Sequence, residues 1–181
     1  LKARGLLFIN DAHPTNGVLR MRLVETARGY VAGFALHSAG GNLNDTASAV
    51  YRMLPGLDVP PDGKVGVSVL VFDNALPYPL SAEPAVLELM DGMLDRLAEE
   101  MAAIPGTIIL ERRNLGDVAM ETELAGGDAL FLSGALLVDG GLSLKTQSGD
   151  LNGIREVKLT LRIRDLSNGA SAVVSDSGNV R

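Results

Sequence analysis

Hydrophobic and polar residues alternate along two segments near the ends of the chain. Close to the N-terminus, residues 18–25 (VLRMRLVE) alternate apolar and charged side chains for most of their length. An apolar run at residues 6–9 precedes them across the turn-rich residues 10–17, and a turn at Gly29 leads into a third run at residues 30–36. A period of two is typical of a strand with one face in water. We therefore predict antiparallel strands over the first 40 residues.

The C-terminal segment alternates more strictly. Every second residue from Val157 to Ile163 is Val, Leu or Ile, and the residues between them are Lys, Thr and Arg. The sequence Ser-Asn-Gly at residues 167–169 is a tight-turn signal, and residues 172–175 follow as a further short strand. This pattern predicts a second antiparallel hairpin at the end of the chain.

Two shorter helices are predicted in the middle of the chain. Between Gly41 and Pro55, apolar residues recur at intervals of three and four, with Asn44 or Asp45 as the N-cap candidate. Pro55 is expected to end this helix. Asn114 can cap another helix from Leu115 to about Ala125.

The longest predicted helix covers residues 84–103 and begins near Ser81 or Ala82. One face is apolar and the other acidic, which is typical of a helix lying on a core. The apolar face comprises Val86, Leu87, Met90, Met93, Leu94, Leu97, Met101 and Ile104, and the acidic face comprises Glu88, Asp91, Asp95, Glu99 and Glu100. We interpret the acidic face as solvated surface.

Short apolar runs between these helices predict buried strands at residues 65–72, 107–110 and 129–138, with a connection at residues 139–153. The element order is therefore β-β-β-α-β-α-β-α-β-β-β. It predicts an α/β (α+β) fold in which a mixed sheet is flanked by about three helices, with antiparallel hairpins at both ends of the chain. We divide the chain into an N-terminal β-hairpin segment, residues 1–40, which can join the same sheet, and an α/β domain, residues 41–181.

Composition excludes several classes of function. The chain has 181 residues and a net charge of −6, and its longest basic run is two arginines, so nucleic acid is not an expected partner. Aromatic residues make up only 4% and Trp is absent, which argues against stacking on bases or sugars. The absence of Cys rules out disulfides, thiolate nucleophiles and Cys metal sites. No apolar stretch reaches 18 residues, so no transmembrane segment is expected.

Motifs of catalysis or cofactor binding are also missing from the sequence. There is no Gly-x-Ser-x-Gly, and Gly63-Lys64 is followed by Val rather than the Ser or Thr of a phosphate loop. The only two histidines are His13 and His37, which we interpret as exposed residues of a turn and a strand end. We expect no catalytic residue, no cofactor and no metal ion.

One compact charged cluster follows the predicted strand 107–110 and consists of Glu111, Arg112, Arg113 and Asn114. The ends of strands are where sites tend to lie in α/β folds. The cluster is therefore our candidate for contact with a partner or another subunit. The alternative is that Glu111 pairs locally with one arginine while the other is solvated.

Several segments in order resemble one family of envelope proteins. The strand Val65–Asn74 resembles the opening strand of that family, and the helix 84–103 is in its expected place. The stretch Ile108–Leu115 (IILERRNL) resembles a Glu-Arg-x-Asn-Leu motif, and this match weighs most. Residues 127–134 (GDALFLSG) and 157–169 resemble a later strand and the closing hairpin. The chain is similar in this way to the envelope-lipoprotein superfamily of the curli secretion channel CsgG, the penicillin-binding-protein activator LpoB and the flagellar lipoprotein FlgO.

The resemblance implies a non-catalytic, periplasmic domain that binds another protein or assembles with copies of itself. It also implies a lipid anchor in the outer membrane, and a start at Leu1 rather than Met allows a targeting segment and an anchoring Cys upstream. A secretion pore is disfavoured, because residues 139–155 are too polar to form a membrane-facing band.

Two other hypotheses remain open. The first is a small enzyme that uses carboxylates at strand ends, such as Asp73, Glu111 and Asp128. The second is a subunit of a ring-forming assembly.

Overall fold

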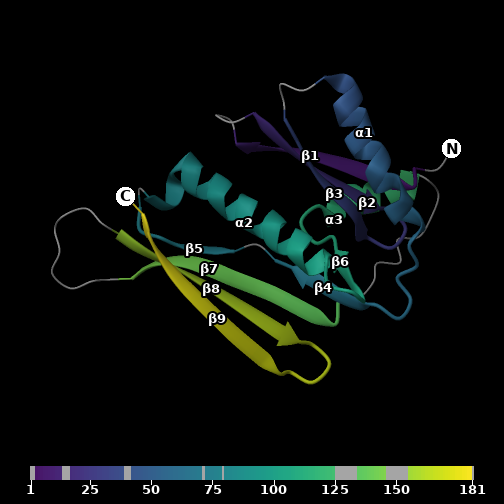
Figure 1. Ribbon diagram of the computed structural model, residues 1–181. Coiled ribbons are helices and arrows are strands. Elements are labelled where there is room, and N and C mark those ends of the chain that lie inside the picture. The colour runs from purple at the N-terminus through teal and green to yellow at the C-terminus, as the bar shows by residue number, and fades with distance from the viewer. Residues whose placement is uncertain are drawn as a thin grey trace.

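A mixed β-sheet runs through the molecule and carries the helices (Figure 1). The computed structural model describes residues 3–13, 17–38, 42–70, 72–78, 80–124, 134–145 and 155–180. The strands are β1 (Gly5–His13), β2 (Val18–Glu25), β3 (Tyr30–Ser38), β4 (Val65–Val69), β5 (Asp73–Ala75), β6 (Thr107–Leu110), β7 (Leu136–Lys145), β8 (Arg155–Asp165) and β9 (Ser171–Val180). In these described parts of the chain, nine strands form one sheet in the order β1-β2-β3-β6-β4-β7-β8-β9, and β5 pairs with β7.

The helices are α1 (Leu43–Met53), α2 (Pro84–Ala102) and α3 (Leu115–Leu124), with short 3-10 helices η1 (Leu54–Asp58) and η2 (Leu80–Ala82). Antiparallel pairing joins β1, β2 and β3 at one end of the chain and β7, β8 and β9 at the other. The parallel pairs β4–β6 and β4–β7 lie between them. The predicted mixed sheet with terminal hairpins and three helices is confirmed.

Strand lengths differ from the prediction at both ends of the chain. Residues 10–13, predicted as a turn, extend β1, with Asn10 opposite Arg20 in β2. Residues 139–145, predicted as part of a connection, extend β7, whereas residues 129–133 lie outside the described part of the chain. The cause is glycine at positions 140 and 141. A Cβ on Gly140 would lie 2.4 Å from the carbonyl oxygen of Thr160, so this glycine permits close strand packing rather than a turn.

Helix boundaries were predicted more closely than helix caps. Asn42, rather than Asn44 or Asp45, is the N-cap of α1, and its side chain accepts a hydrogen bond from the backbone N–H of Asp45. The α-helix ends at Met53, and the chain continues through Pro55 as η1. The N-cap of α2 is Glu83, without a side-chain capping bond, and not Ser81 or Ala82.

The first two helices pack on opposite faces of the sheet. Met21 and Leu23 of β2 pack against Ala49 and Met53 of α1. Residues of α2 pack against the other face in the main core. This cluster of buried residues comprises Val67, Val69, Phe72, Leu76, Met90, Leu94, Ala98, Ile109, Val138 and Leu142.

The buried stripe of α2 is narrower than predicted. Met90 and Leu94 are buried, and Ala98, which was not predicted, completes the stripe. Leu87 and Ile104 were predicted to face the core but are exposed, with relative accessibilities of 49% and 51%. Val86, Met93, Leu97 and Met101 are partly buried and pack against the main core, so the predicted apolar face differs from the structure only at Leu87 and Ile104.

Candidate functional site

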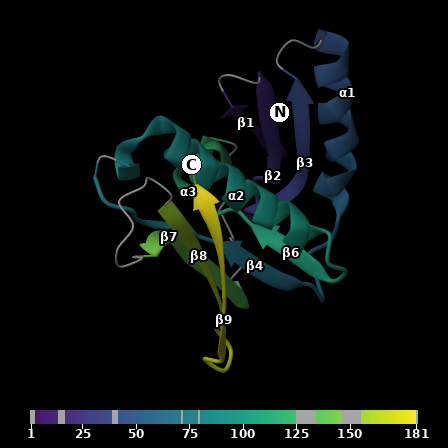
Figure 2. The ribbon, with the colours of Figure 1, turned by 60° about the vertical axis from the view of Figure 1, so that its left-hand side comes forward.

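The sheet is narrowly connected between β3 and β6. Within the described residues, one register pair, Tyr30 with Leu110, joins these two strands, and the backbone N–H of Glu111 adds a hydrogen bond of 2.8 Å to the carbonyl oxygen of Gly29. Figure 2 shows β1–β3 with α1 on one side of this junction and β7–β9 on the other, with α2 between them. Contacts from side chains must therefore hold the two halves of the sheet together.

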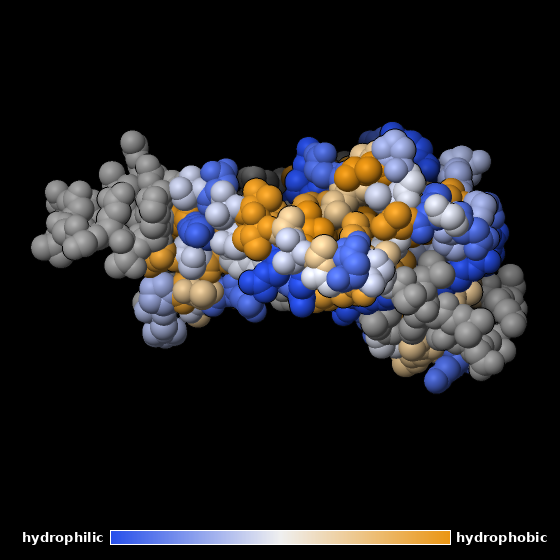
Figure 3. Space-filling view, turned by 90° about the horizontal axis from the view of Figure 1, so that it is seen from below, coloured by the Kyte–Doolittle hydropathy of each residue, from blue (hydrophilic) through white to orange (hydrophobic). Residues whose placement is uncertain are grey.

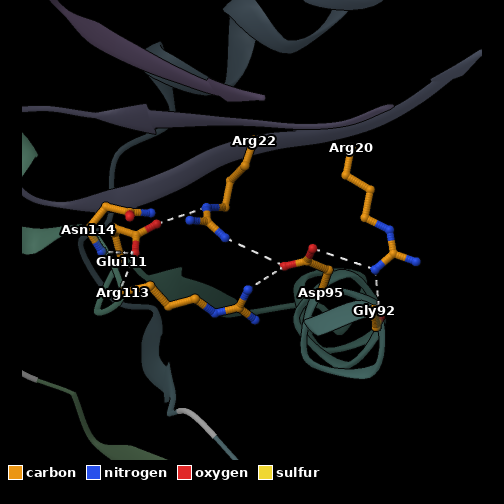
Figure 4. Close-up of polar contacts among 7 residues, drawn as sticks. All are labelled: Arg20, Arg22, Gly92, Asp95, Glu111, Arg113 and Asn114. Atoms are coloured by element: carbon orange, nitrogen blue, oxygen red, sulfur yellow. Dashed lines mark hydrogen bonds and ion pairs between the residues drawn. The ribbon is translucent and has the colours of Figure 1, made fainter. Parts of the chain in front are cut away.

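Asp95 of α2 is the centre of these contacts (Figure 4). Its Oδ1 atom lies 2.7 Å from Nη1 of Arg113 and 3.5 Å from Nη1 of Arg22. Its Oδ2 atom lies 3.5 Å from Nη1 of Arg20, which also donates a 2.7 Å hydrogen bond to the carbonyl oxygen of Gly92. One carboxylate thus links β2, α2 and the segment after β6.

Glu111 forms the second anionic centre. Its Oε2 atom lies 2.8 Å from Nε of Arg22. Its Oε1 atom accepts backbone N–H groups from Arg113 at 2.6 Å and Asn114 at 3.0 Å. These bonds shape the chain just before α3 begins at Leu115. We call the set Arg20, Arg22, Asp95, Glu111 and Arg113 the ionic interface.

The ionic interface is largely removed from water. Glu111 is 2% exposed, Asp95 7% and Arg22 8%. Burial lowers the pKa of the Arg22 guanidinium, and the nearby Glu111 carboxylate acts in the opposite direction. The guanidinium also lies 5.5 Å from the centre of the Phe8 ring, within cation–π range. Removal of one partner from such a cluster leaves an uncompensated buried charge, which destabilises the fold strongly.

The structure changes one sequence interpretation, that of Asp95, and adds two site residues that the sequence analysis did not single out. Asp95 was assigned to a solvated acidic face, and the structure corrects this because Arg20 and Arg22 of β2 reach over that face of α2. The arginines of β2 were not among the candidate site residues. Their alternation in residues 18–25 could have marked them, since it places both on one face of a strand.

The predicted contact cluster is only partly a surface feature. Glu111 is buried, Arg113 pairs with Asp95, and the Arg112 Nη1 atom donates a 2.9 Å hydrogen bond to the carbonyl oxygen of Glu111. Asn114 is half-buried. Glu111 does not pair locally with an arginine side chain of the cluster as the alternative supposed; its partner is Arg22. A role of Glu111, Arg112, Arg113 and Asn114 in partner contact stays a prediction.

Of the other candidate residues, those in the described part of the chain do not belong to the ionic interface. Asp73 is exposed on β5, and Asp128 lies outside the described residues. His13 belongs to β1 rather than to a turn. His37 is half-buried, which corrects its assignment as exposed, and its Nε2 atom has no hydrogen-bond partner among the described residues. The described residues also contain no group of three or more His, Asp or Glu that could hold a metal ion.

A second feature is the outer edge of β9. Within the described residues this strand pairs with β8 alone and ends the sheet. Residues 171–177 are all exposed, including Val173 at 59% and Val174 at 60%. Figure 3 views the molecule from below, the side of β9 in Figure 1, and shows hydrophobic residues gathered among hydrophilic ones on that face.

Comparisons with known proteins find partial similarities to solved structures. No protein-family model matches the chain, and no curated protein matches it. A PelC dodecamer from Paraburkholderia phytofirmans aligns at 16% identity over 67% of this chain and 76% of that one, with a TM-score of 0.33. Lipoprotein GNA1162 from Neisseria meningitidis aligns at 15% identity over 64% and 83%, with a TM-score of 0.35.

Protein XCC0632 from Xanthomonas campestris aligns at 12% identity over 66% of this chain and 71% of that one, with a TM-score of 0.20. This chain is thus similar in part to PelC and to a lipoprotein. The narrower resemblance to CsgG, LpoB and FlgO stays a prediction. Of the helices in the described residues, none combines the length and the apolar character needed to cross a membrane.

Proposed function

We propose that this chain is a non-catalytic interaction domain of the bacterial cell envelope, periplasmic and tethered to the outer membrane, which binds another protein by strand addition at β9. The observation that carries the proposal is the free edge of β9, a strand of ten residues in which residues 171–177 are exposed. A strand at the edge of a sheet presents unpaired backbone N–H and C=O groups, to which an extended segment of a partner can bind.

The sequence of β9 lacks the usual protection of an edge strand. Natural edges are guarded by proline, by lysine, by bulges or by shortness. Residues 171–180 (SAVVSDSGNV) contain no proline and no lysine, and their register with β8 runs without a bulge. Asp176 is the one charged residue of the strand. The opposite edge, β1, has a register shift between Asp11 and His13, which makes it a poorer template.

Cross-strand pairing explains why Val174 of β9 is available for contact with a partner. Val174 lies opposite Leu161 of β8, so both side chains point to the face of the sheet on which α2 packs. Leu161 is packed against the main core, whereas Val174 lies beyond it. A partner strand beside β9 would continue this apolar face and cover Val174.

The state of Glu111 supports a non-catalytic function. Its carboxylate is engaged by Arg22 and by two backbone N–H groups, and it is buried. A general acid or base must reach its substrate. The enzyme hypothesis would require this carboxylate to leave all three contacts.

Site-specific photo-crosslinking in cells tests the proposal. We expect a crosslinker at position 174 to capture an envelope protein or a second copy of the chain, and one at Met120, which is 59% exposed on α3, to capture neither. Val174→Lys should weaken the purified interaction by about tenfold or more, because an edge lysine opposes strand addition, while Met120→Lys leaves it unchanged. Equal crosslinking at both positions, or normal binding by Val174→Lys, would refute β9 as the contact. Fractionation of the cells checks the envelope location.

A further inference from the structure

The ladder between β8 and β9 determines which backbone groups of β9 point away from the sheet. The backbone N–H of Asp165 donates a 2.8 Å hydrogen bond to the carbonyl oxygen of Ala170. Hydrogen-bonded pairs alternate along an antiparallel ladder, so Ala172, Val174 and Asp176 also direct their backbone groups towards β8. The outward N–H and C=O groups therefore belong to the residues between them, which are Ser171, Val173, Ser175 and Ser177.

Asp176 limits the part of this edge that an added strand can use. Its Oδ1 atom accepts a 2.8 Å hydrogen bond from the backbone N–H of Ser177. A donor that already has an acceptor in its own strand is less suited to bind a second strand. The part of the edge best suited to strand addition is thus residues 171–175, whose outward groups belong to Ser171, Val173 and Ser175.

A second β9 fits this segment when the two strands run antiparallel and Val173 lies opposite itself. A two-fold axis normal to the sheet joins two copies of one edge in this way, and it keeps corresponding faces of the two sheets on the same side. Ser171 of each copy then lies opposite Ser175 of the other. Every outward position of residues 171–175 thus has a hydrogen-bonding partner in the second copy.

The side chains on both faces suit this arrangement. On the face that α2 covers, Val174 lies opposite Leu161 of β8, and Ala172 lies opposite Ile163. Leu161 and Ile163 already pack against the main core. Pairing of Val174 with Ala172 of the second copy extends this apolar surface from one copy into the other without a break. On the opposite face the two Val173 side chains, each 59% exposed, would cover one another.

The charge of Asp176 favours this register over shifted ones. With Val173 at the two-fold axis, Asp176 lies beyond the paired segment. An axis at Val174 would place this carboxylate opposite Ala172, and an axis at Ser175 would place it opposite Val174. A further shift would set the two Asp176 carboxylates against each other, which is destabilising. The edge is therefore complementary to itself in hydrogen bonding, in apolar contact and in charge.

We propose that the strand added at β9 is β9 of a second copy of this chain, paired antiparallel with Val173 at the two-fold axis. This inference rests on the proposed strand addition at β9 and specifies its partner. The two copies form one continuous sheet, with both α2 helices on the same face. A short strand edge buries less surface than a permanent interface does, so we expect a reversible dimer. Tethering of both copies to one membrane would raise their effective concentration.

Disulfide trapping tests the register, and the absence of Cys from the chain makes each introduced thiol unique. Ala172 and Val174 of opposite copies form a pair without backbone hydrogen bonds, in which the Cα atoms are about 4.5 Å apart, close enough for a disulfide. An equimolar mixture of Ala172→Cys and Val174→Cys should form a mixed disulfide about tenfold faster than either variant alone. The control mixture, Ala172→Cys with Met120→Cys on α3, should react no faster than the single variants.

Sedimentation equilibrium measures the same contact in the unaltered protein. We expect the mass to rise from one copy to two between about 1 μM and about 1 mM, the range of weak reversible contacts. Val173→Lys sets two like charges opposite each other and should weaken the dimer by about tenfold or more. Met120→Lys, at another exposed position, should leave the dimer unchanged.

Two results would overturn the second copy as the partner: a mass of one copy at every concentration, or a mixed disulfide that forms no faster than in the control mixture. A faster disulfide in Val174→Cys alone would place the axis at Val174 and contradict the register. The crosslinker at position 174 in cells separates these failures from that of the proposed function. Capture of a different envelope protein leaves strand addition at β9 intact, whereas capture of nothing contradicts both.

Discussion

The Nε atom of Arg22 lies 2.8 Å from Oε2 of Glu111. Arg22 belongs to β2, near the start of the chain, and Glu111 follows β6, so the pair crosses the junction where β3 and β6 share one register pair. Asp95 extends the same contacts to α2. The ionic interface therefore links β2 to the segment after β6 at a junction where few backbone hydrogen bonds join the strands.

Removal of one charge from the ionic interface should destabilise the fold strongly. Asp95→Asn leaves the guanidinium groups of Arg22 and Arg113 without their shared partner, and we expect a loss of about 3–5 kcal/mol in the free energy of unfolding. Urea titration followed by circular dichroism measures it. Glu100→Gln is the control, because Glu100 is 59% exposed and pairs with Arg96 on the same helix. Its effect should stay below about 1 kcal/mol. Equal effects of the two variants would contradict a buried interface.

Truncation along α2 should reveal its buried stripe. Leu94 is 1% exposed, so Leu94→Ala removes apolar contacts and leaves a cavity, at a cost of about 2–5 kcal/mol. Leu89, on the same helix, is 54% exposed, and Leu89→Ala should cost under about 1 kcal/mol. Urea titration of both variants provides the measurement. A larger loss at Leu89 than at Leu94 would mean that the helix presents another face to the sheet.

Two glycine substitutions should act in opposite directions. A Cβ on Gly56 would lie 1.8 Å from the carbonyl oxygen of Ala32, so Gly56→Ala must push η1 away from β3 and lower the Tm. A Cβ on Gly116 would meet no atom within 4 Å. Because alanine favours the helix more than glycine does, Gly116→Ala should add about 0.5 kcal/mol. Calorimetry distinguishes the two, and a stabilised Gly56→Ala would disprove the close approach of η1 to β3.

Removal of the hydroxyl of Tyr30 should loosen the same contact between η1 and β3. The hydroxyl oxygen lies 3.1–3.3 Å from the carbonyl oxygens of Gly56, Leu57 and Val59, and its single proton is shared among these three acceptors. Tyr30→Phe keeps the ring and deletes the donor, so we expect a loss of about 1–2 kcal/mol in the free energy of unfolding. Tyr78→Phe, at a position 84% exposed, is the control and should be neutral. An unchanged midpoint for Tyr30→Phe in urea would argue against this hydrogen bond.

Glu99 should contribute a specific pH dependence. Burial raises the pKa of this carboxyl above its ordinary value of 4.5. The Glu99 carboxyl therefore loses its proton at a lower pH in the unfolded chain than in the folded one. As the pH rises, ionisation favours the unfolded chain, and the free energy of unfolding falls. We expect Glu99→Gln to gain stability relative to the unaltered protein between about pH 4 and about pH 7. Paired thermal scans across that range measure the difference. A difference that falls with rising pH would have the wrong sign.

Local patterns were sufficient for most of the secondary structure. The alternation in residues 18–25 and 157–163 corresponds to β2 and β8, and the run at 107–110 corresponds to β6. Glycine misled the prediction after Val138, because a turn and a close strand contact require the same small residue. That ambiguity is resolved only by the neighbour, which for Gly140 is the backbone of Thr160.

The sequence by itself determined the fold class, since periods of two and of three to four decide which segments become strands and helices and which faces they bury. It could not determine that β6 enters the sheet between β3 and β4, because strand order depends on contacts between distant segments. That order brings Glu111 to Arg22, buries Asp95 and leaves β9 at the edge. The neighbours of Asp95 in the sequence predict a solvated side chain. It is buried because β2, a strand distant in the sequence, places Arg20 and Arg22 over it.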